Sequence, residues 1–185
     1  GQSNMTRPLS GTLHAAQEIA AANYPLIRLF RVKETTAEQP AETVDGSWQA
    51  CTPATVADFS GVAYFFARDL HQRLGVPVGL IHSSWGGTPI EAWIGDDALR
   101  RTAIHPTIAA RWEKDRAEFA VRKIRHPIEQ AVWKQAEDRA QATHTLNPLP
   151  WPTPPTGPGT PYAPSRLFNG MIAPLQPCAL RGIIW

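Results

Sequence analysis

The stretch that decides the fold is residues 60–81, SGVAYFFARDLHQRLGVPVGLI. Ser60 is a good helix N-cap, and Gly75 followed by Pro77 is a typical helix end. Apolar side chains recur every four residues and predict the buried face of this helix: Val62, Phe66, Leu70 and Leu74. Residues 76–81 then form a continuous apolar run, the pattern of a strand buried on both faces.

The preceding residues repeat the same theme. Residues 13–22 are rich in helix formers and stop before Pro25, whereas residues 26–32 alternate apolar side chains with Arg28 and Arg31, as a strand does. Residues 33–46 are polar and are expected at the surface. Helices alternating with strands predict an α/β fold with a parallel sheet.

The second half of the chain has another character. Residues 96–143 favour helices, and Pro106 and Pro127 predict two or three helices there rather than one. Residues 147–164 contain too many prolines for a helix or a ladder, so an extended connector is expected, either a spacer or a cleft lining beside Trp151 and Tyr162. Residues 181–185, RGIIW, are typical of a buried strand.

Composition limits the function. The 185 residues suffice for one core of ordinary size. A net charge of +2, from 18 basic and 16 acidic side chains, disfavours nucleic acid as a partner. No apolar run approaches the ~20 residues of a membrane span, and no secretion leader opens the sequence. Cys51 and Cys178 have no partner at metal-binding spacing, so they are free thiols or one disulfide.

A glycine pair follows the predicted strand 76–81. Residues 82–93 read HSSWGGTPIEAW, and in open α/β sheets the ligand crevice lies just beyond such strand ends. A backbone N–H of Gly86 or Gly87 can donate to an oxyanion there, although both glycines also suit a sharp turn. The downstream Gly-Lys-[Ser/Thr] of a P-loop is missing, which disfavours phosphate binding.

The first five residues, GQSNM, place Ser3 in what reads as a turn. Ser3 is either a turn residue or a nucleophile. Together with residues 82–93 and with SRLFNGMIAPLQPCALRGIIW, this block resembles the sialate O-acetylesterase family of SGNH-type carbohydrate esterases. Ser3 matches the nucleophile of that family, Gly86 and Gly87 match its second block, and residues 167–174 match a signature segment.

The resemblance implies a flavodoxin-like three-layer α/β/α sandwich without a cofactor or metal. It implies that a serine attacks a sugar acetyl ester, that a histidine takes its proton, and that an aspartate orients this histidine. Backbone N–H groups of the serine and of a second-block glycine, with a side-chain amide, hold the oxyanion. A periplasmic or secreted location is also implied.

Several parts of the family pattern are absent. The Gly-Glu-Ser-Asn segment, the Asp-x-x-His block and the strand before the serine have no counterpart in the sequence. We therefore expect one partial domain over residues 1–185, with a helical insertion at about 96–146 and a connector at about 147–164, poorly soluble and inactive by itself. His82 is interpreted as a buried or supporting residue, and no histidine is assigned as the base.

Other residues allow two interpretations each. Trp85 and Trp93 can stack on a sugar or pack beside the glycine turn. Gln2 and Arg7 can contact a sialic acid carboxylate, and Asn4 can bond within its loop. Glu91 can form a carboxylate pair with Asp96 or Asp97, although these aspartates serve better as helix N-caps.

Two rivals to a sialic acid esterase remain open. One is an esterase for acetylxylan or another polysaccharide, because the shared blocks build acetyl-transfer chemistry and do not read the glycan. The other is a non-catalytic sugar-binding module that lacks the base.

Overall fold

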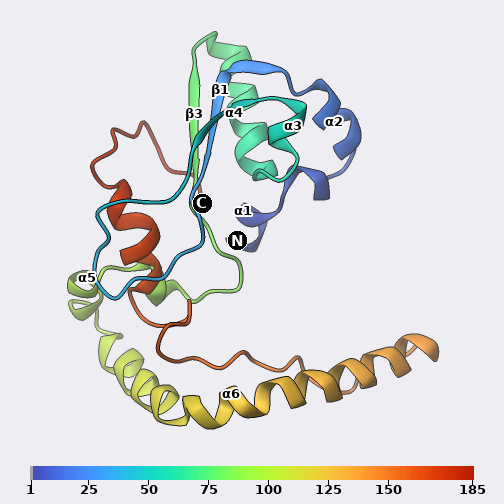
Figure 1. The fold of residues 1–185 in the computed structure, drawn as a ribbon, viewed down its shortest axis with the longest axis vertical. Helices are drawn as coiled ribbons and strands as arrows, with labels where there is room; N and C mark the ends of the chain where they lie inside the picture. The colour runs from blue at the N-terminus through green and yellow to red at the C-terminus, as the bar shows by residue number, and fades with distance from the viewer. Residues whose placement is uncertain (1) are drawn as a thin grey trace.

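The structure, a computed structural model, describes residues 2–185, and the side chain of Gln2 lies outside the described part together with Gly1. Helices and strands occur in a mixed α/β order along the chain (Figure 1). The elements are α1 Gln2–Thr6, η1 Leu9–Gly11, α2 Ala15–Ala21, β1 Tyr24–Arg31, β2 Trp48–Cys51, α3 Pro53–Val56, α4 Gly61–Leu74, β3 Val78–His82, η2 Ile90–Trp93, α5 Asp96–Arg100, α6 His105–Ala142, the π-helix η3 Phe168–Ile172 and η4 Ala173–Leu175.

A three-stranded sheet forms the centre, in the order β2-β1-β3. β1 and β3 run parallel and pair from Ile27 with Val78 to Arg31 with His82, so their carboxyl ends lie at one edge. This confirms the predicted α/β class and parallel pairing. β2 was not predicted; it pairs antiparallel to β1, with Trp48 opposite Phe30.

Both faces of the sheet carry apolar clusters, because alternate side chains of β1 point to opposite sides. Ile27 and Leu29 belong to the cluster under the helices α2, α3 and α4. Val32, with Phe30 packed beside it, belongs to a second cluster formed by η2 and η3. Leu80 and Ile81 of β3 divide between the two clusters in the same way.

α4 has the predicted ends but not the predicted buried face. The Ser60 hydroxyl accepts a hydrogen bond from the Ala63 amide at 3.3 Å, and Gly75 ends the helix with φ 67°. The predicted stripe is wrong, because Val62, Phe66 and Leu74 are 41%, 43% and 62% exposed. The buried side chains are instead Ala63, Tyr64 and Ala67. Small alanines let the helix approach the sheet closely.

Residues 76–81 were expected to form a strand that is buried on both faces, and they do not. β3 begins at Val78, and Val76 before it is 45% exposed. Within the strand Leu80 and His82 are buried, whereas Gly79 is exposed. The physical reason is that β3 has a neighbour only on its β1 side among the described residues.

Residues 96–143 form two helices, α5 and α6, which agrees with the prediction of two or three. Pro127 does not divide α6, however, which is one continuous helix of 38 residues. Pro106 lies in its first turn, where proline is tolerated. The connector 147–164 contains no helix or strand, as predicted, and runs back along α6 (Figure 1). The Trp133 indole donates to the Leu149 carbonyl at 3.1 Å and meets the Trp151 ring at 4.5 Å, which supports α6 despite the proline.

Residues 181–185 do not form the predicted strand. Ile183 and Trp185 are 82% and 67% exposed, because no described strand pairs with this segment. Both cysteines are free thiols; Cys51 is buried and Cys178 is exposed. Among the described helices none is long and apolar enough to cross a membrane.

Candidate functional site

Ser3 lies in a short helix rather than in the predicted turn. α1 spans Gln2–Thr6, and the Thr6 hydroxyl donates to the Ser3 carbonyl at 2.8 Å. The Arg7 carbonyl accepts from the Gly61 amide at 2.9 Å, which ties the end of this segment to the start of α4. Ser3 is exposed to solvent.

The glycine pair that follows β3 packs against α1. A β-carbon on Gly86 would lie 3.1 Å from the Thr6 hydroxyl oxygen and 3.8 Å from the Ser3 Cα. Gly87 is exposed, has φ 76° and has nothing within 4 Å of a β-carbon position. The structure therefore brings two of the predicted site segments together. Gly86 allows the close approach, and Gly87 allows the turn.

His82, the last residue of β3, is buried and sits beneath these two segments. Its Nε2 atom is 2.5 Å from the Ser84 hydroxyl, and its ring meets Phe59 edge-on at 5.4 Å. Burial lowers the pKa of His82 to about 4, the charge of Arg31 adds to this shift, and the Met5 backbone opposes it. Among the described residues, no group forms a hydrogen bond with the buried Nδ1 atom of His82. The imidazole is neutral at physiological pH.

The two tryptophans of this region differ. Trp93 is 8% exposed and donates its indole N–H to the Thr88 hydroxyl at 2.8 Å, so it packs inside the protein. Trp85 is half-buried and packs against the second apolar cluster. Of the two, only Trp85 retains surface that a ligand can reach.

The predicted carboxylate-binding residues are not gathered at Ser3. The Arg7 Nε atom donates to the Gly11 carbonyl at 2.8 Å, which holds this side chain back over η1. The Asn4 carbonyl accepts from the Arg7 amide at 3.2 Å, a bond within the segment as expected. The interaction predicted for the Gln2 side chain falls outside the described residues.

Glu91 does not form a carboxylate pair. It is 6% exposed and makes an ion pair with Arg111 of α6. Asp96 pairs instead with Arg100 at 2.7 Å. The N-cap of α5 is Gly95, so the capping prediction is wrong in detail: Asp96 and Asp97 lie in the first turn, where the helix dipole favours negative charge.

The signature segment 167–174 fastens the loop that follows β1. The Asn169 side-chain amide donates to the carbonyls of Ala37 at 3.3 Å and Glu38 at 3.0 Å. A β-carbon on Gly170 would lie 2.3 Å from the Thr35 carbonyl oxygen, so only glycine fits. The Ser83 hydroxyl donates to the Met171 carbonyl at 3.0 Å, which links the segment to the glycine loop. The segment is therefore bonded both to the loop that follows β1 and to the loop that follows β3.

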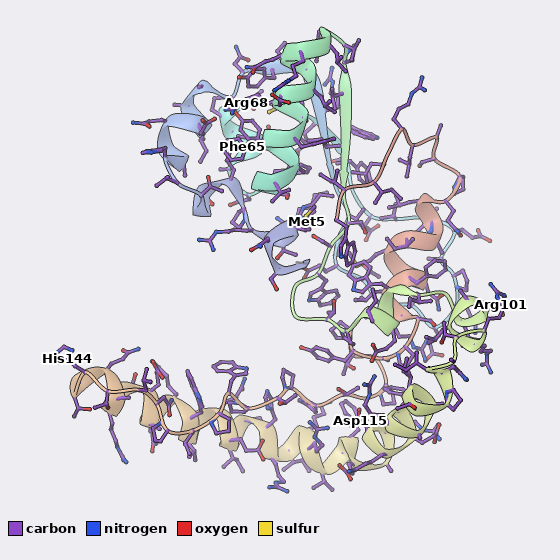
Figure 2. The ribbon with its side chains drawn as sticks, turned by 180° about the vertical axis from the view of Figure 1, so that it is seen from behind. Met5, Phe65, Arg68, Arg101, Asp115 and His144 are labelled. Atoms are coloured by element: carbon purple, nitrogen blue, oxygen red, sulfur yellow. The ribbon has the colours of Figure 1, made fainter. Side chains whose placement is uncertain are left out.

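Sequence reasoning missed two residues of the site, Thr6 and Ser84. Thr6 binds the Ser3 carbonyl and touches Gly86, and its spacing of three residues from Ser3 was the available signal. Among the described residues no histidine is hydrogen-bonded to the Ser3 hydroxyl. Figure 2 shows how distant one histidine is: His144 lies at the far end of α6, well away from Met5 in α1.

Comparison with known proteins adds independent information. No family model matches the chain. A sialate O-acetylesterase of Rattus norvegicus is 31% identical over 194 residues, an alignment that covers the whole chain, and that of Homo sapiens is 36% identical over 113 residues, or 56% of the chain. The chain belongs to the sialate O-acetylesterase-like family.

A solved structure of a carbohydrate acetylesterase is also similar to this chain. A carbohydrate acetylesterase from Xanthomonas citri superposes over the whole chain with a TM-score of 0.64 and 29% identity. The chain spans 33% of the length of the rat relative, 22% of the human relative and 30% of the Xanthomonas chain. The chain thus spans between 22% and 33% of the length of these esterases.

Proposed function

We propose that this member of the sialate O-acetylesterase-like family contributes the nucleophile part of a carbohydrate esterase, with Ser3 as the nucleophile. The observation that carries the proposal is the contact of Gly86 with the α1 helix at Ser3, beside the carboxyl end of β3. An exposed hydroxyl beside backbone amides at a strand end suits acyl transfer. The relatives named as acetylesterases support an acetyl ester as the substrate.

In the proposed reaction the Ser3 hydroxyl oxygen attacks the acetyl carbonyl carbon and gives its proton to a base. The negative carbonyl oxygen is held by the backbone N–H of Ser3 and of Gly87 or Gly86, each worth about 3 kcal/mol of barrier. The bond to the sugar oxygen then breaks, and the sugar leaves with a proton. Water attacks the acetyl-enzyme, releases acetate and returns the proton to Ser3.

The base in this proposal comes from outside the 185 residues. His82 is buried and its Nε2 is engaged by Ser84, so it is not available to Ser3. We propose accordingly that the chain alone is inactive and that a longer protein supplies an Asp-x-x-His. We also propose that the sheet is the core of a three-layer sandwich in one partial domain, with residues 96–164 as an insertion; the apolar clusters on both faces support this.

The sugar is proposed as sialic acid or a related acetylated sugar, acetylxylan included. The bonding of Arg7 to the Gly11 carbonyl favours the wider substrate class, since it withdraws the proposed partner of a sialic acid carboxylate. The solved relative is likewise named for carbohydrate acetyl esters in general.

Two assays test the proposal. Acetate release by the full-length protein is measured on acetylated sialic acid and on acetylated xylan; turnover of at least one of them is expected, and turnover of neither contradicts the esterase. The 185-residue chain is then compared with its Ser3→Ala variant on p-nitrophenyl acetate. A Ser3-dependent burst from this chain would show that the base lies within it.

A further inference from the structure

A single buried imidazole lies between the two segments that the proposed function brings together. On one side the His82 Nε2 atom binds the Ser84 hydroxyl at 2.5 Å, two residues before Gly86. On the other side the ring lies beside the backbone of Met5, two residues after Ser3. One side chain thus contacts both the nucleophile helix and the start of the glycine loop.

The imidazole is itself firmly placed. Its residue is 7% exposed, and the ring is packed edge-on against Phe59. The His82 carbonyl accepts from the Val32 amide at 3.0 Å, and Arg31 opposite pairs with His82 in the β1–β3 register. A ring that is fixed by its strand and by its packing can position the loop that is bonded to it.

The glycine loop depends on this contact. Gly86 and Gly87 have no side chains with which to fix the loop, yet Gly86 must stay against Thr6 and Ser3. Ser84 supplies a side-chain bond two residues before Gly86, and the Thr88 hydroxyl, bonded to the Trp85 carbonyl at 2.7 Å, closes the loop behind the glycines. Loss of the Ser84 bond removes one anchor of the N-terminal half of the loop, while the bond of Ser83 to the Met171 carbonyl and the packing of Trp85 remain.

We infer that His82 is a positioning residue, which sets the distance between the Ser3 nucleophile and the backbone donors at Gly86 and Gly87 through its bond to Ser84. This inference rests on the proposed function of Ser3. His82 does not exchange a proton with the substrate in this account, so its effect is on geometry alone.

Kinetics of the full-length protein on p-nitrophenyl acetate test the inference. His82→Leu and Ser84→Ala are each expected to lower kcat by about 10-fold to 100-fold, the range for a displacement of up to about 1 Å, with KM nearly unchanged. The double variant should be no slower than His82→Leu, because both changes remove the same bond. His82→Gln should recover part of kcat, since its amide can reach Ser84. His144→Asn and Ser10→Ala, both at exposed positions, are the matched controls and should match wild type.

Multiplicative losses in the double variant, or wild-type kcat in His82→Leu, would overturn the inference. Crystal structures of wild type and His82→Leu separate it from the proposed function. A change of about 0.5 Å or more in the distance from Gly86 to Ser3 is expected. If the distance from Gly86 to Ser3 is unchanged in His82→Leu, the positioning role of His82 is wrong, even if Ser3→Ala is inactive. If the distance changes but Ser3→Ala is fully active, His82 does position the two segments and Ser3 is not the nucleophile.

Discussion

Alanine at Gly86 should mainly lower kcat, whereas alanine at Gly87 should mainly lower stability, because the two glycines have different surroundings. At Gly86 the new β-carbon would be 3.1 Å from the Thr6 hydroxyl oxygen, so Thr6 must yield by a few tenths of an ångström. Thr6 is bonded to the Ser3 carbonyl at 2.8 Å, and the displacement therefore passes to the nucleophile. At Gly87 the β-carbon meets nothing within 4 Å, but φ is 76°.

The magnitudes follow from these contacts. Gly86→Ala is expected to lower kcat by about 10-fold to 100-fold, because small displacements of a nucleophile are costly, while stability changes by about 1 kcal/mol or less. Gly87→Ala is expected to cost about 1–2 kcal/mol of stability, the strain of a left-handed alanine. In a domain of this size that lowers the melting temperature by roughly 2–8 °C.

The assay is acetate release by the full-length protein, with thermal unfolding of the same samples. Gly182→Ala is the matched control, since its β-carbon position is open and no left-handed backbone is needed there. Wild-type kcat in Gly86→Ala would refute the claim that this glycine controls the placement of Ser3.

Three further predictions concern stability and reactivity. Gly170→Ala should lower the free energy of unfolding in urea by several kcal/mol, because its β-carbon would be 2.3 Å from the Thr35 carbonyl oxygen; equal stability of Gly170→Ala and Gly182→Ala would contradict the fit. His82 has a folded-state pKa of about 4 against about 6.5 unfolded, so the unfolded chain binds the extra proton and up to about 3 kcal/mol of stability is lost as pH falls from 6.5 to 4. Urea denaturation across that range should show this loss in wild type and not in His82→Leu; the same slope in both would assign it elsewhere. Burial raises the pKa of the Cys51 thiol to about 11, so a thiol reagent should label Cys178 at once in the folded chain and Cys51 only after denaturation; rapid labelling of both would contradict the burial.

Local sequence signals predicted the ends of α4 and the two parallel strands of the sheet. Ser60 and Gly75 carry their own capping chemistry, and both ends of α4 lie where they indicated. The β1 and β3 strands were found within a few residues. The buried face of α4 was predicted wrongly, because the spacing of apolar residues shows that a helix has an apolar face but not which face the sheet covers. The sheet covers the face that carries Ala63 and Ala67.

Other failures have tertiary causes. Pro127 removes one helix hydrogen bond, but the returning connector packs on α6 and compensates for that loss. β2 is short, and it forms a strand because it pairs with β1, a contact that its own sequence does not indicate. Residues 181–185 have strand composition and no described partner strand.

The site was predictable in part. Ser3 and the glycine pair came from the motifs, and the structure places Gly86 against the helix that carries Ser3. The helical form of residues 2–5 was not predictable, because a Gly-x-Ser sequence suits a turn as well as a helix start. The contact of Thr6 with Gly86 joins segments far apart in the chain, which no single motif contains. The bond between His82 and Ser84 spans only two residues, but the burial of His82 that fixes it is a tertiary feature.

Trapping the acetyl-enzyme tests the central claim most directly. The full-length protein is mixed with p-nitrophenyl acetate, quenched in acid within the first turnover, digested and analysed by mass spectrometry. The account predicts an acetyl group on the hydroxyl of Ser3, in the peptide that contains this residue, and none in the Ser3→Ala variant, which should also lose turnover while remaining folded. Acetylation of another residue, or unimpaired turnover by Ser3→Ala, would contradict it.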